Sequence, residues 1–335
     1  MKHKTVYGTI RRSVRSLRRM TPRKLANLLA MIRDLKTRNP VTSSRPPFIR
    51  LNAYPHCNLK CPGCILGRQN AGVEPRKRQE PVMTLESFQR CIDPIADTLL
   101  RIVLYDEGEP LLHPDIFRMV AHADGKGIST TISTSLSMPM TEERVEELVT
   151  SGLDHLIVAM DGTDQETYAR YHVGGDLLRV QDNIKRIIAA KSRLHHRYPE
   201  LELQFLDFGY NSHQLSGARH LARSLGVDHF YAFGALADHT LDKLPFTGSE
   251  LERIGHGCYH LWAVADVNSA GELVPCDFGE DRDMPAVGSL LTDKFDELWN
   301  GREMVNLRKA FGRKSERLGS EFCKTCGLTA APPAL

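Results

Sequence analysis

Three closely spaced cysteines constrain this chain more than any other stretch does. Cys57, Cys61 and Cys64 are separated by four and then three positions, and the next cysteine is Cys91. A structural zinc site needs four ligands in a closed tetrahedron, so a tight trio without a fourth member argues against zinc. A cubane iron–sulfur cluster accepts three thiolates and keeps one iron open for a small ligand. The trio therefore predicts a site that carries out chemistry.

The spacing C-x3-C-x2-C follows a strand expected at residues 48–53, and it resembles the signature of the radical S-adenosyl-L-methionine (SAM) superfamily. The resemblance implies that Cys57, Cys61 and Cys64 hold a 4Fe-4S cluster whose open iron binds SAM. It also implies reductive cleavage of SAM to a 5′-deoxyadenosyl radical, which takes hydrogen from a substrate. Gly63 departs from the pattern, because an aromatic residue often precedes the third cysteine, so adenine packing must come from elsewhere. The alternative is a reduced trio without metal.

Composition is that of an ordinary globular protein. The 335 residues can bury a large core, and 41% hydrophobic with 25% charged residues is typical of soluble proteins. Because no long apolar run and no signal-peptide stretch is present, we expect a cytoplasmic protein. Seven of the eight cysteines fall in two groups, which fits metal ligation in a reducing compartment better than disulfides.

The first 46 residues form a basic segment. Residues 1–46 carry 13 Lys or Arg against one acid, Asp34, so they bear +12, and the remainder of a +3 chain bears −9. Thr21 and Pro22 predict the start of a helix that runs to about residue 36. The apolar face expected for that helix consists of Leu25, Leu28, Leu29, Ile32 and Leu35.

We interpret this segment as a helix that packs on the body with a solvated basic face. There are two alternatives: residues 1–36 contact an anionic surface, such as the inner membrane surface, or they contact an anionic substrate. Nucleic acid is not expected as a partner, because aromatic residues are nearly absent from the segment. Residues 39–47 are interpreted as a linker.

From residue 47 to about 236, short apolar runs alternate with helical patterns. This alternation predicts parallel strands joined by right-handed crossovers, an α/β fold with a partial (β/α)6 TIM-like barrel open on one side. The predicted strands are 48–53, 100–105, 127–134, 154–160, 202–208 and 228–234. The predicted helices lie near 84–98, 114–125, 141–152, 165–192 and 213–225.

The pattern changes after a connector at about 237–257. Apolar runs at 262–267 and 273–276 predict a β-hairpin, and a helix is expected at about 293–311. The expected domains are therefore a basic helical arm and linker, a barrel, and a small C-terminal α+β iron–sulfur domain. Their predicted ranges are 1–46, 47–240 and 241–330.

The turn after the second predicted strand resembles the superfamily's GGEP motif, which receives the SAM amino group. In this chain it reads Asp106-Glu107-Gly108-Glu109-Pro110. The resemblance implies that Glu109 and the local backbone hold the ammonium, since a cation there needs acceptors in a fixed arrangement. Glu107 stands where the first glycine of the motif usually stands.

The resemblance implies further SAM contacts at the ends of later strands. The third ends in Ser133, Thr134 and Ser135, near the expected ribose and carboxylate, and the fourth leads into Asp161 after Ala159, which replaces a serine. His172 stands where an arginine often pairs with the SAM carboxylate, and the two side chains are not equivalent. Arg170 could take that role instead, with His172 as a partly exposed residue at a helix end. Two further positions match polar positions of the family: Gln204 and Asn211.

A second group of cysteines lies near the C-terminus. Cys258, Cys276, Cys323 and Cys326, with Gly271 placed as G-x4-C, resemble the twitch form of the SPASM auxiliary domain, as in 2-deoxy-scyllo-inosamine dehydrogenase-like enzymes. The resemblance implies a second 4Fe-4S cluster, giving two in all, with all four irons ligated by protein. A structural zinc site is the alternative. The remaining Cys91 is predicted to be a small buried hydrophobe in a helix.

A fully ligated auxiliary cluster cannot chelate substrate, so its expected role is to pass electrons. This favours oxidation of an alcohol in a sugar, cyclitol or nucleoside, served by a flavodoxin- or ferredoxin-type reductant. A radical epimerase or dehydratase, a peptide-modifying maturase, and a non-catalytic metal-bound scaffold are the alternatives. The sequence identifies neither the substrate nor a catalytic base.

Overall fold

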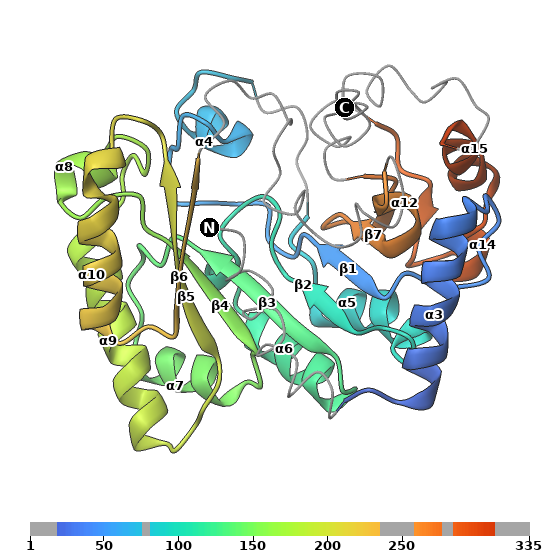
Figure 1. The fold of residues 1–335 in the computed structure, drawn as a ribbon, viewed down its shortest axis with the longest axis horizontal. Coiled ribbons are helices and arrows are strands. Elements are labelled where there is room, and N and C mark those ends of the chain that lie inside the picture. The colour runs from blue at the N-terminus through green and yellow to red at the C-terminus, as the bar shows by residue number, and fades with distance from the viewer. Residues whose placement is uncertain (1–18, 76–80, 235–257, 277–283, 312–335) are drawn as a thin grey trace.

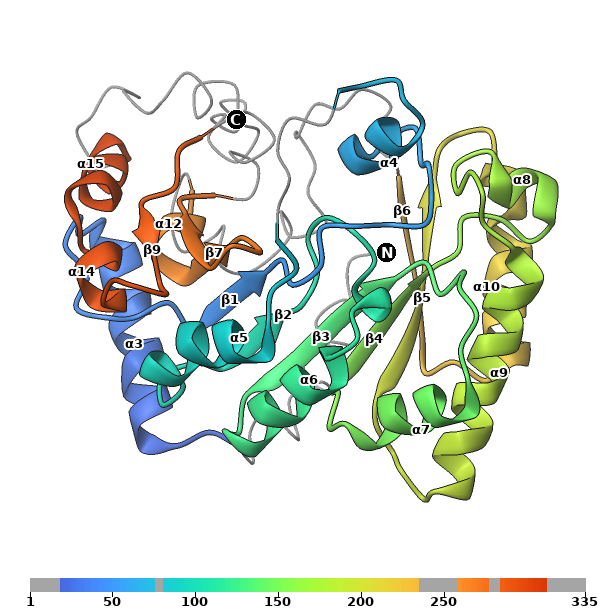
Figure 2. The ribbon, with the colours of Figure 1, turned by 180° about the vertical axis from the view of Figure 1, so that it is seen from behind.

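The computed structural model describes residues 19–75, 81–234, 258–276 and 284–311. Across those residues one nine-stranded sheet runs through the molecule, in the order β6-β5-β4-β3-β2-β1-β7-β8-β9. Figures 1 and 2 show this sheet from opposite sides, with β5 and β6 standing at a steep angle to β1 and β2. Among the described strands β6 does not pair with β1, so the barrel is partial and open, as predicted.

Each strand of the barrel is parallel to the next, and all six predicted strands are confirmed. Buried aliphatic residues such as Ile49, Ile102 and Ile132 pack one face of the sheet against helices, which is why a parallel sheet of this composition is stable in water. The strands are β1 (Phe48–Leu51), β2 (Arg101–Val103), β3 (Ser129–Thr134), β4 (His155–Ala159), β5 (Glu200–Asp207) and β6 (His229–Gly234).

Most of the helices that follow the strands lie along the outside of the sheet, whereas the helix after the cysteine loop lies beyond the strand ends (Figures 1 and 2). The barrel helices are α4 (Ile65–Asn70), α5 (Leu85–Ile92), α6 (Ile116–Gly125), α7 (Glu142–Thr150), α8 (Gln165–Ala169), α9 (Leu177–Arg193) and α10 (Leu215–Leu225). Short 3-10 turns lie at η1 (Asp93–Ile95), η2 (Pro110–Leu112) and η3 (Ser212–Gln214). Cys91 is buried in α5 against apolar neighbours, as predicted.

The single helix predicted over 165–192 is wrong, because the chain forms α8 and α9 with a turn between them. In the segment between them Gly174 adopts a φ of +88°, which a continuous right-handed helix does not contain. Asp176 then caps α9, since its side chain accepts a hydrogen bond from the amide of Arg179. Periodicity alone did not reveal this break, although the two adjacent glycines were its signal.

The C-terminal strands extend the barrel sheet. The predicted hairpin is confirmed as β7 (Val264–Val267) and β8 (Glu272–Val274), followed by β9 (Gly288–Ser289). β7 also pairs in parallel with β1, with Ala265 opposite Ile49. The edge of the barrel at β1 is therefore covered by the segment that carries the later cysteines.

One helix expected at 293–311 is instead two, α14 (Phe295–Trp299) and α15 (Arg302–Ala310). Gly301 separates them, and a β-carbon there would lie 2.8 Å from the carbonyl oxygen of Glu297. A short helix, α12 (His260–Ala263), precedes β7.

The basic segment contributes α3 (Pro22–Thr37), which begins as predicted, with the Thr21 side chain accepting from the amide of Lys24. The predicted apolar face is wrong in part, because Leu25 and Leu29 are 46% and 58% exposed. Leu35 is buried as predicted and Met31 is buried with it, and α3 contacts α12. The helical spacing predicted in residues 1–18 lies outside the described residues.

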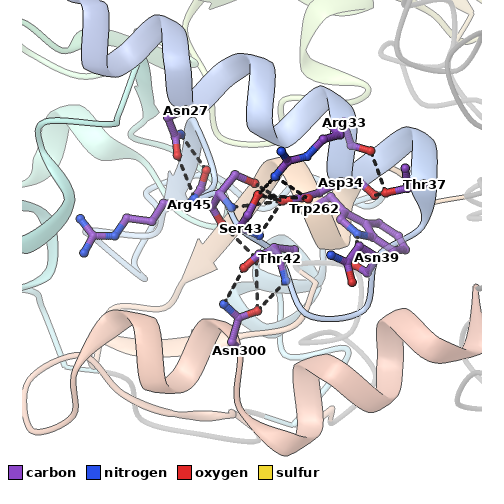
Figure 3. Close-up of polar contacts among 11 residues, drawn as sticks. Asn27, Arg33, Asp34, Thr37, Asn39, Thr42, Ser43, Arg45, Trp262 and Asn300 are labelled. Atoms are coloured by element: carbon purple, nitrogen blue, oxygen red, sulfur yellow. Dashed lines mark hydrogen bonds and ion pairs between the residues drawn. The ribbon is translucent and has the colours of Figure 1, made fainter.

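The linker after α3 is held by side chains from both ends of the chain (Figure 3). Asp34 accepts hydrogen bonds from the amides of Ser43 and Ser44 at 2.7 and 3.1 Å. Asn300 Oδ1 accepts from the amide of Thr42 at 2.9 Å, and Trp262 Nε1 donates to the Asn39 carbonyl at 2.8 Å. The linker is thus a fixed strap that joins α3 to the C-terminal elements.

None of the helices in the described ranges combines the length and the apolar character that crossing a membrane requires.

Candidate active site

The loop from Cys57 to Cys64 follows β1 and is held by the helix after it. Asn70, the last residue of α4, donates from Nδ2 to the carbonyls of Cys57 and Leu59 at 3.0 and 2.9 Å. Gly67 lets α4 approach the loop, since a β-carbon there would lie 2.2 Å from the carbonyl oxygen of Cys61. The backbone between the cysteines is therefore fixed before any metal binds.

The three thiols of the loop are half-buried and lie close together. Burial raises the pKa of Cys57 to about 11. Burial also raises the pKa of Cys61, and repulsion from Cys64 and then Cys57 raises it further. Three neighbouring thiols in a poorly solvated loop become thiolates when cationic iron balances their negative charge. The three cysteines therefore fit an iron–sulfur cluster.

Among the described residues, no three His, Cys, Asp or Glu side chains converge on a point where one metal ion would be held. A cubane takes each thiolate at a separate iron, so it needs three neighbouring thiols rather than a common centre. Cys57, Cys61 and Cys64 would hold such a cluster and leave the fourth iron to SAM.

The turn after β2 packs on the segment that leads into the cysteine loop. Gly108 has a φ of +85°, and a β-carbon there would lie 2.0 Å from the carbonyl oxygen of Tyr54, so only glycine fits. The amide of Glu109 donates to the His56 carbonyl at 2.8 Å. The turn predicted to receive the SAM ammonium is thus joined to the predicted cluster loop.

The side chain of Glu109 faces the protein interior and is 2% exposed. Its carboxylate accepts from Thr134 Oγ1 at 2.6 Å, from the amide and hydroxyl of Ser135 at 2.8 Å each, and from the Leu111 amide at 3.2 Å. Burial raises the pKa of Glu109, and the four donors oppose that shift. The structure brings Glu109, Thr134 and Ser135 together, with the carboxylate shaping the turn from inside, and Ser133, next to Thr134 in sequence, is half-buried.

Asp161 joins the ends of β4 and β5. It is fully buried, and its Oδ1 accepts from the Leu206 amide at 2.6 Å. Asn211 donates from Nδ2 to the carbonyls of Asp161 and Leu206 at 2.9 and 2.8 Å. Gln204 is half-buried on β5, in register with Ala159. Asp161 and Asn211 therefore support the strand ends rather than line an open surface.

His172 lies behind Cys61. It is 4% exposed, so the alternative of a partly exposed residue at a helix end is wrong. Its Nε2 is 2.8 Å from Asp161 Oδ2, its Nδ1 is 4.0 Å from Cys61 Sγ, and its ring stacks on Tyr168. Arg170, the other residue considered for the SAM carboxylate, lies over the ring of Tyr210 at 3.9 Å.

Tyr171 covers the position where the expected aromatic residue is missing. A β-carbon on Gly63 would lie 2.9 Å from Cε2 of Tyr171. The Tyr171 ring also contacts Phe208 after β5, with ring centroids 4.4 Å apart. The sequence interpretation did not identify Tyr171, and its place beside His172 was the only signal available.

The second group of cysteines is described in part. Cys258 is buried, and its carbonyl accepts from Arg38 Nη1 at 3.0 Å, so the last turn of α3 supports this cysteine. Cys276 is half-buried after β8, within electrostatic range of Arg50 on β1. Cys323 and Cys326 lie outside the described residues.

Tyr105, which follows β2, is influenced by charged residues of other strands. Burial raises the pKa of Tyr105, and the charges of Arg50 on β1 and Glu202 on β5 also act on it. The influence of Glu202 reaches Tyr105 although β3 and β4 lie between β2 and β5 in the sheet. The guanidinium of Arg50 also lies 3.9 Å from the carboxylate of Asp106 and 3.8 Å from that of Asp266. These ion pairs connect the predicted SAM motif to β7.

Known protein families match this chain in its barrel and in its C-terminal segment. A family model of the radical SAM superfamily matches residues 51–199, and the SPASM iron–sulfur cluster-binding domain matches residues 258–327. An AdoMet-dependent heme synthase of Methanosarcina barkeri is 23% identical over 70% of this chain and 63% of that protein. The chain thus matches less than two thirds of that relative's length.

Two solved structures share the fold at 16% identity. SuiB of Streptococcus suis bound to precursor peptide SuiA has a TM-score of 0.66 and is matched over 91% of this chain and 74% of its own. BtrN in complex with AdoMet and 2-DOIA has a TM-score of 0.52 and is matched over 86% of this chain and 98% of its own.

The two family matches agree with the two cysteine groups, since each match includes one group. SAM and 4Fe-4S clusters are therefore the cofactors of this protein. The chain belongs to the radical SAM superfamily and carries a SPASM iron–sulfur cluster-binding domain after its barrel.

Proposed function

We propose that this radical SAM enzyme oxidises an alcohol of a small polar substrate, such as a sugar, a cyclitol or a nucleoside, to a carbonyl. One observation carries the proposal: the SPASM match contains four cysteines, Cys258, Cys276, Cys323 and Cys326, one for each iron of a single cubane. A cluster with no open iron has no coordination position for substrate. Its remaining use is to accept and pass electrons.

When bound and reduced, SAM and its cluster supply a 5′-deoxyadenosyl radical that takes a hydrogen atom from the carbinol carbon. The substrate then loses its hydroxyl proton to a base and one electron to the auxiliary site, and its C–O bond becomes C=O. Two electrons leave the substrate in total, one with the hydrogen atom and one alone. A flavodoxin- or ferredoxin-type protein would supply the electron for SAM cleavage.

Three observations support the proposal. Arg50 and Glu202 act electrostatically on Tyr105, and charged groups beside a hydroxyl suit a substrate rich in hydroxyl groups. Cys276 acts electrostatically on Arg50, so an electron acceptor held at Cys276 would be close to these residues. The similarity to BtrN, solved with 2-DOIA, agrees with a small substrate.

Peptide modification is the second candidate. It is favoured by the higher TM-score with SuiB, whose structure holds a precursor peptide. Alcohol oxidation and peptide modification differ in what is removed from the substrate and in the size of the substrate.

Replacing Cys276 with alanine separates SAM cleavage from substrate oxidation. We expect the variant to release 5′-deoxyadenosine from SAM at a rate within a few-fold of the unmodified enzyme, while carbonyl product falls at least about a hundredfold because the electron acceptor is lost. The measurement is mass spectrometry of 5′-deoxyadenosine and product with candidate alcohols deuterated at the carbinol carbon. Cys91→Ala, outside both groups, is the matched control and should keep both products.

The oxidation would be contradicted by a redox-neutral product from the unmodified enzyme, or by undiminished carbonyl product from Cys276→Ala with its auxiliary iron gone. Transfer of deuterium from a precursor peptide, and from no small alcohol, would support the second candidate instead.

We further propose that Tyr171 supplies the adenine contact that Gly63 cannot make. The support is the position of its ring over Gly63 and against Phe208. Tyr171→Ala is expected to weaken SAM binding about tenfold, since a base stacked on an aromatic ring is worth about 1–3 kcal/mol. Tyr171→Phe keeps the ring and should bind SAM as the unmodified enzyme does.

Titration calorimetry of the reconstituted protein with SAM measures this effect. Combining Gly63→Phe with Tyr171→Ala should recover most of the lost affinity, because the new ring can fill the vacated space. Equal SAM affinity in Tyr171→Ala and Tyr171→Phe would show that the adenine lies elsewhere.

A further inference from the structure

We infer that His172, oriented by Asp161, donates a hydrogen bond to the sulfur of Cys61 and thereby raises the reduction potential of the cluster that this cysteine holds. The geometry is a buried row of three groups. Asp161 Oδ2 lies 2.8 Å from His172 Nε2, and His172 Nδ1 lies 4.0 Å from Cys61 Sγ. The histidine and the cysteine are 111 positions apart in sequence.

The ring is held so that this contact persists. Asp161 cannot rotate freely, because its other oxygen accepts from the Leu206 amide at 2.6 Å. The ring of Tyr168 stacks on the imidazole with centroids 4.6 Å apart and an interplanar angle of 20°. The Lys60 amide, next to Cys61, donates to the carbonyl of Val173, next to His172, at 2.9 Å. The backbones of the two partners are therefore tied together.

Both ring nitrogens face acceptors. Oδ2 of Asp161 lies at Nε2 and the sulfur of Cys61 lies at Nδ1, so Nδ1 is the ring nitrogen that we propose as the donor to the sulfur. A donor of this kind at a ligand sulfur stabilises the reduced cluster more than the oxidised one, because reduction adds negative charge to the sulfurs.

This arrangement gives His172 a different role from an arginine that pairs with the SAM carboxylate. The imidazole is buried behind Cys61 and both of its nitrogens are occupied, so it is a positioning residue for the cluster. The inference rests on the cluster at Cys57, Cys61 and Cys64 and not on the proposed oxidation, since the effect exists without substrate.

The test uses the full-length, reconstituted enzyme and the variant His172→Phe, which keeps a ring on Tyr168 but has no donor. The potential is read by electron paramagnetic resonance during a redox titration, with the signal of the SAM-site cluster assigned by its change when SAM is added. At the ambient potential where half of the unmodified cluster is reduced, we expect the reduced fraction of His172→Phe to fall several-fold, with iron content unchanged. His56→Gln, beside Cys57 and exposed, is the matched control and should leave the potential unchanged.

A second measurement is made on the unmodified enzyme, so it does not depend on whether a variant folds. In unmodified enzyme labelled with 15N-histidine, the reduced SAM-site cluster should show a hyperfine coupling to histidine nitrogen, which persists in His56→Gln. The inference is overturned if that coupling is absent, or if His172→Phe carries full iron and titrates at the unmodified potential. If substrate oxidation is absent while these signals remain, the result contradicts the proposed function and leaves this inference in place.

Discussion

Replacing Cys61 with alanine is expected to remove the SAM-site cluster and abolish SAM cleavage. Iron should fall from about eight to about four atoms per chain, because one of two cubanes loses a ligand while the auxiliary cluster keeps its own. Cleavage of SAM should fall by at least about a thousandfold, since the remaining cluster offers no open iron to SAM. Iron and sulfide analysis after anaerobic reconstitution, with chromatography of 5′-deoxyadenosine, measures both effects.

Cys91→Ala is the control, because Cys91 is a buried core residue far from both cysteine groups in sequence. That variant should keep its full iron content and its SAM cleavage, with a modest loss of stability from a small cavity. A Cys61→Ala protein with undiminished iron and activity would show that the cluster is held by other residues.

Replacing Glu109 with alanine is expected to be the most destabilising single change in the turn after β2. The carboxylate is 2% exposed and accepts from Thr134, Ser135 and Leu111, so its removal leaves buried donors without an acceptor. We expect a loss of about 3–5 kcal/mol in the free energy of unfolding, the usual cost of breaking a buried charged network. SAM binding should be lost as well, because the turn beside the cysteine loop is no longer held in shape.

Denaturant unfolding monitored by circular dichroism measures the stability, and calorimetry with the reconstituted protein measures SAM affinity. Glu147→Ala is the matched control, because that glutamate is exposed on α7 and pairs with Arg144 of its own helix. Its loss should cost less than about 0.5 kcal/mol and leave SAM binding intact. Unfolding of Glu109→Ala at the same denaturant concentration as the unmodified protein would contradict the structural role of the buried carboxylate.

The six parallel strands of the barrel and the membership of the superfamily could be predicted from the sequence. Both depend on local signals: the spacing of Cys57, Cys61 and Cys64, and the alternation of apolar runs with helical patterns. Thr21 and Pro22 likewise marked the start of α3. Signals of this kind lie within a few residues of each other, so they are visible before the chain folds.

The partners of the site residues were decided by tertiary structure. Gly63 was identified as a departure from the pattern, but only packing places Tyr171 over it. The motif predicts a SAM contact for His172 or Arg170, and only the packing places His172 between Asp161 and Cys61. The pairing of β7 with β1 also joins segments more than two hundred residues apart.

Local patterns were sufficient to predict the cofactor chemistry and the six parallel strands, because cysteine spacing and apolar periodicity are properties of neighbouring residues. The side chains around the described cysteines, the buried face of α3 and the attachment of the C-terminal strands follow instead from tertiary packing. Those outcomes depend on burial and on side-chain contacts between distant segments, since the same local pattern is compatible with several partners. The physical reason is that a residue's role at this site follows from what it faces, and what it faces is set by the packing of the whole sheet.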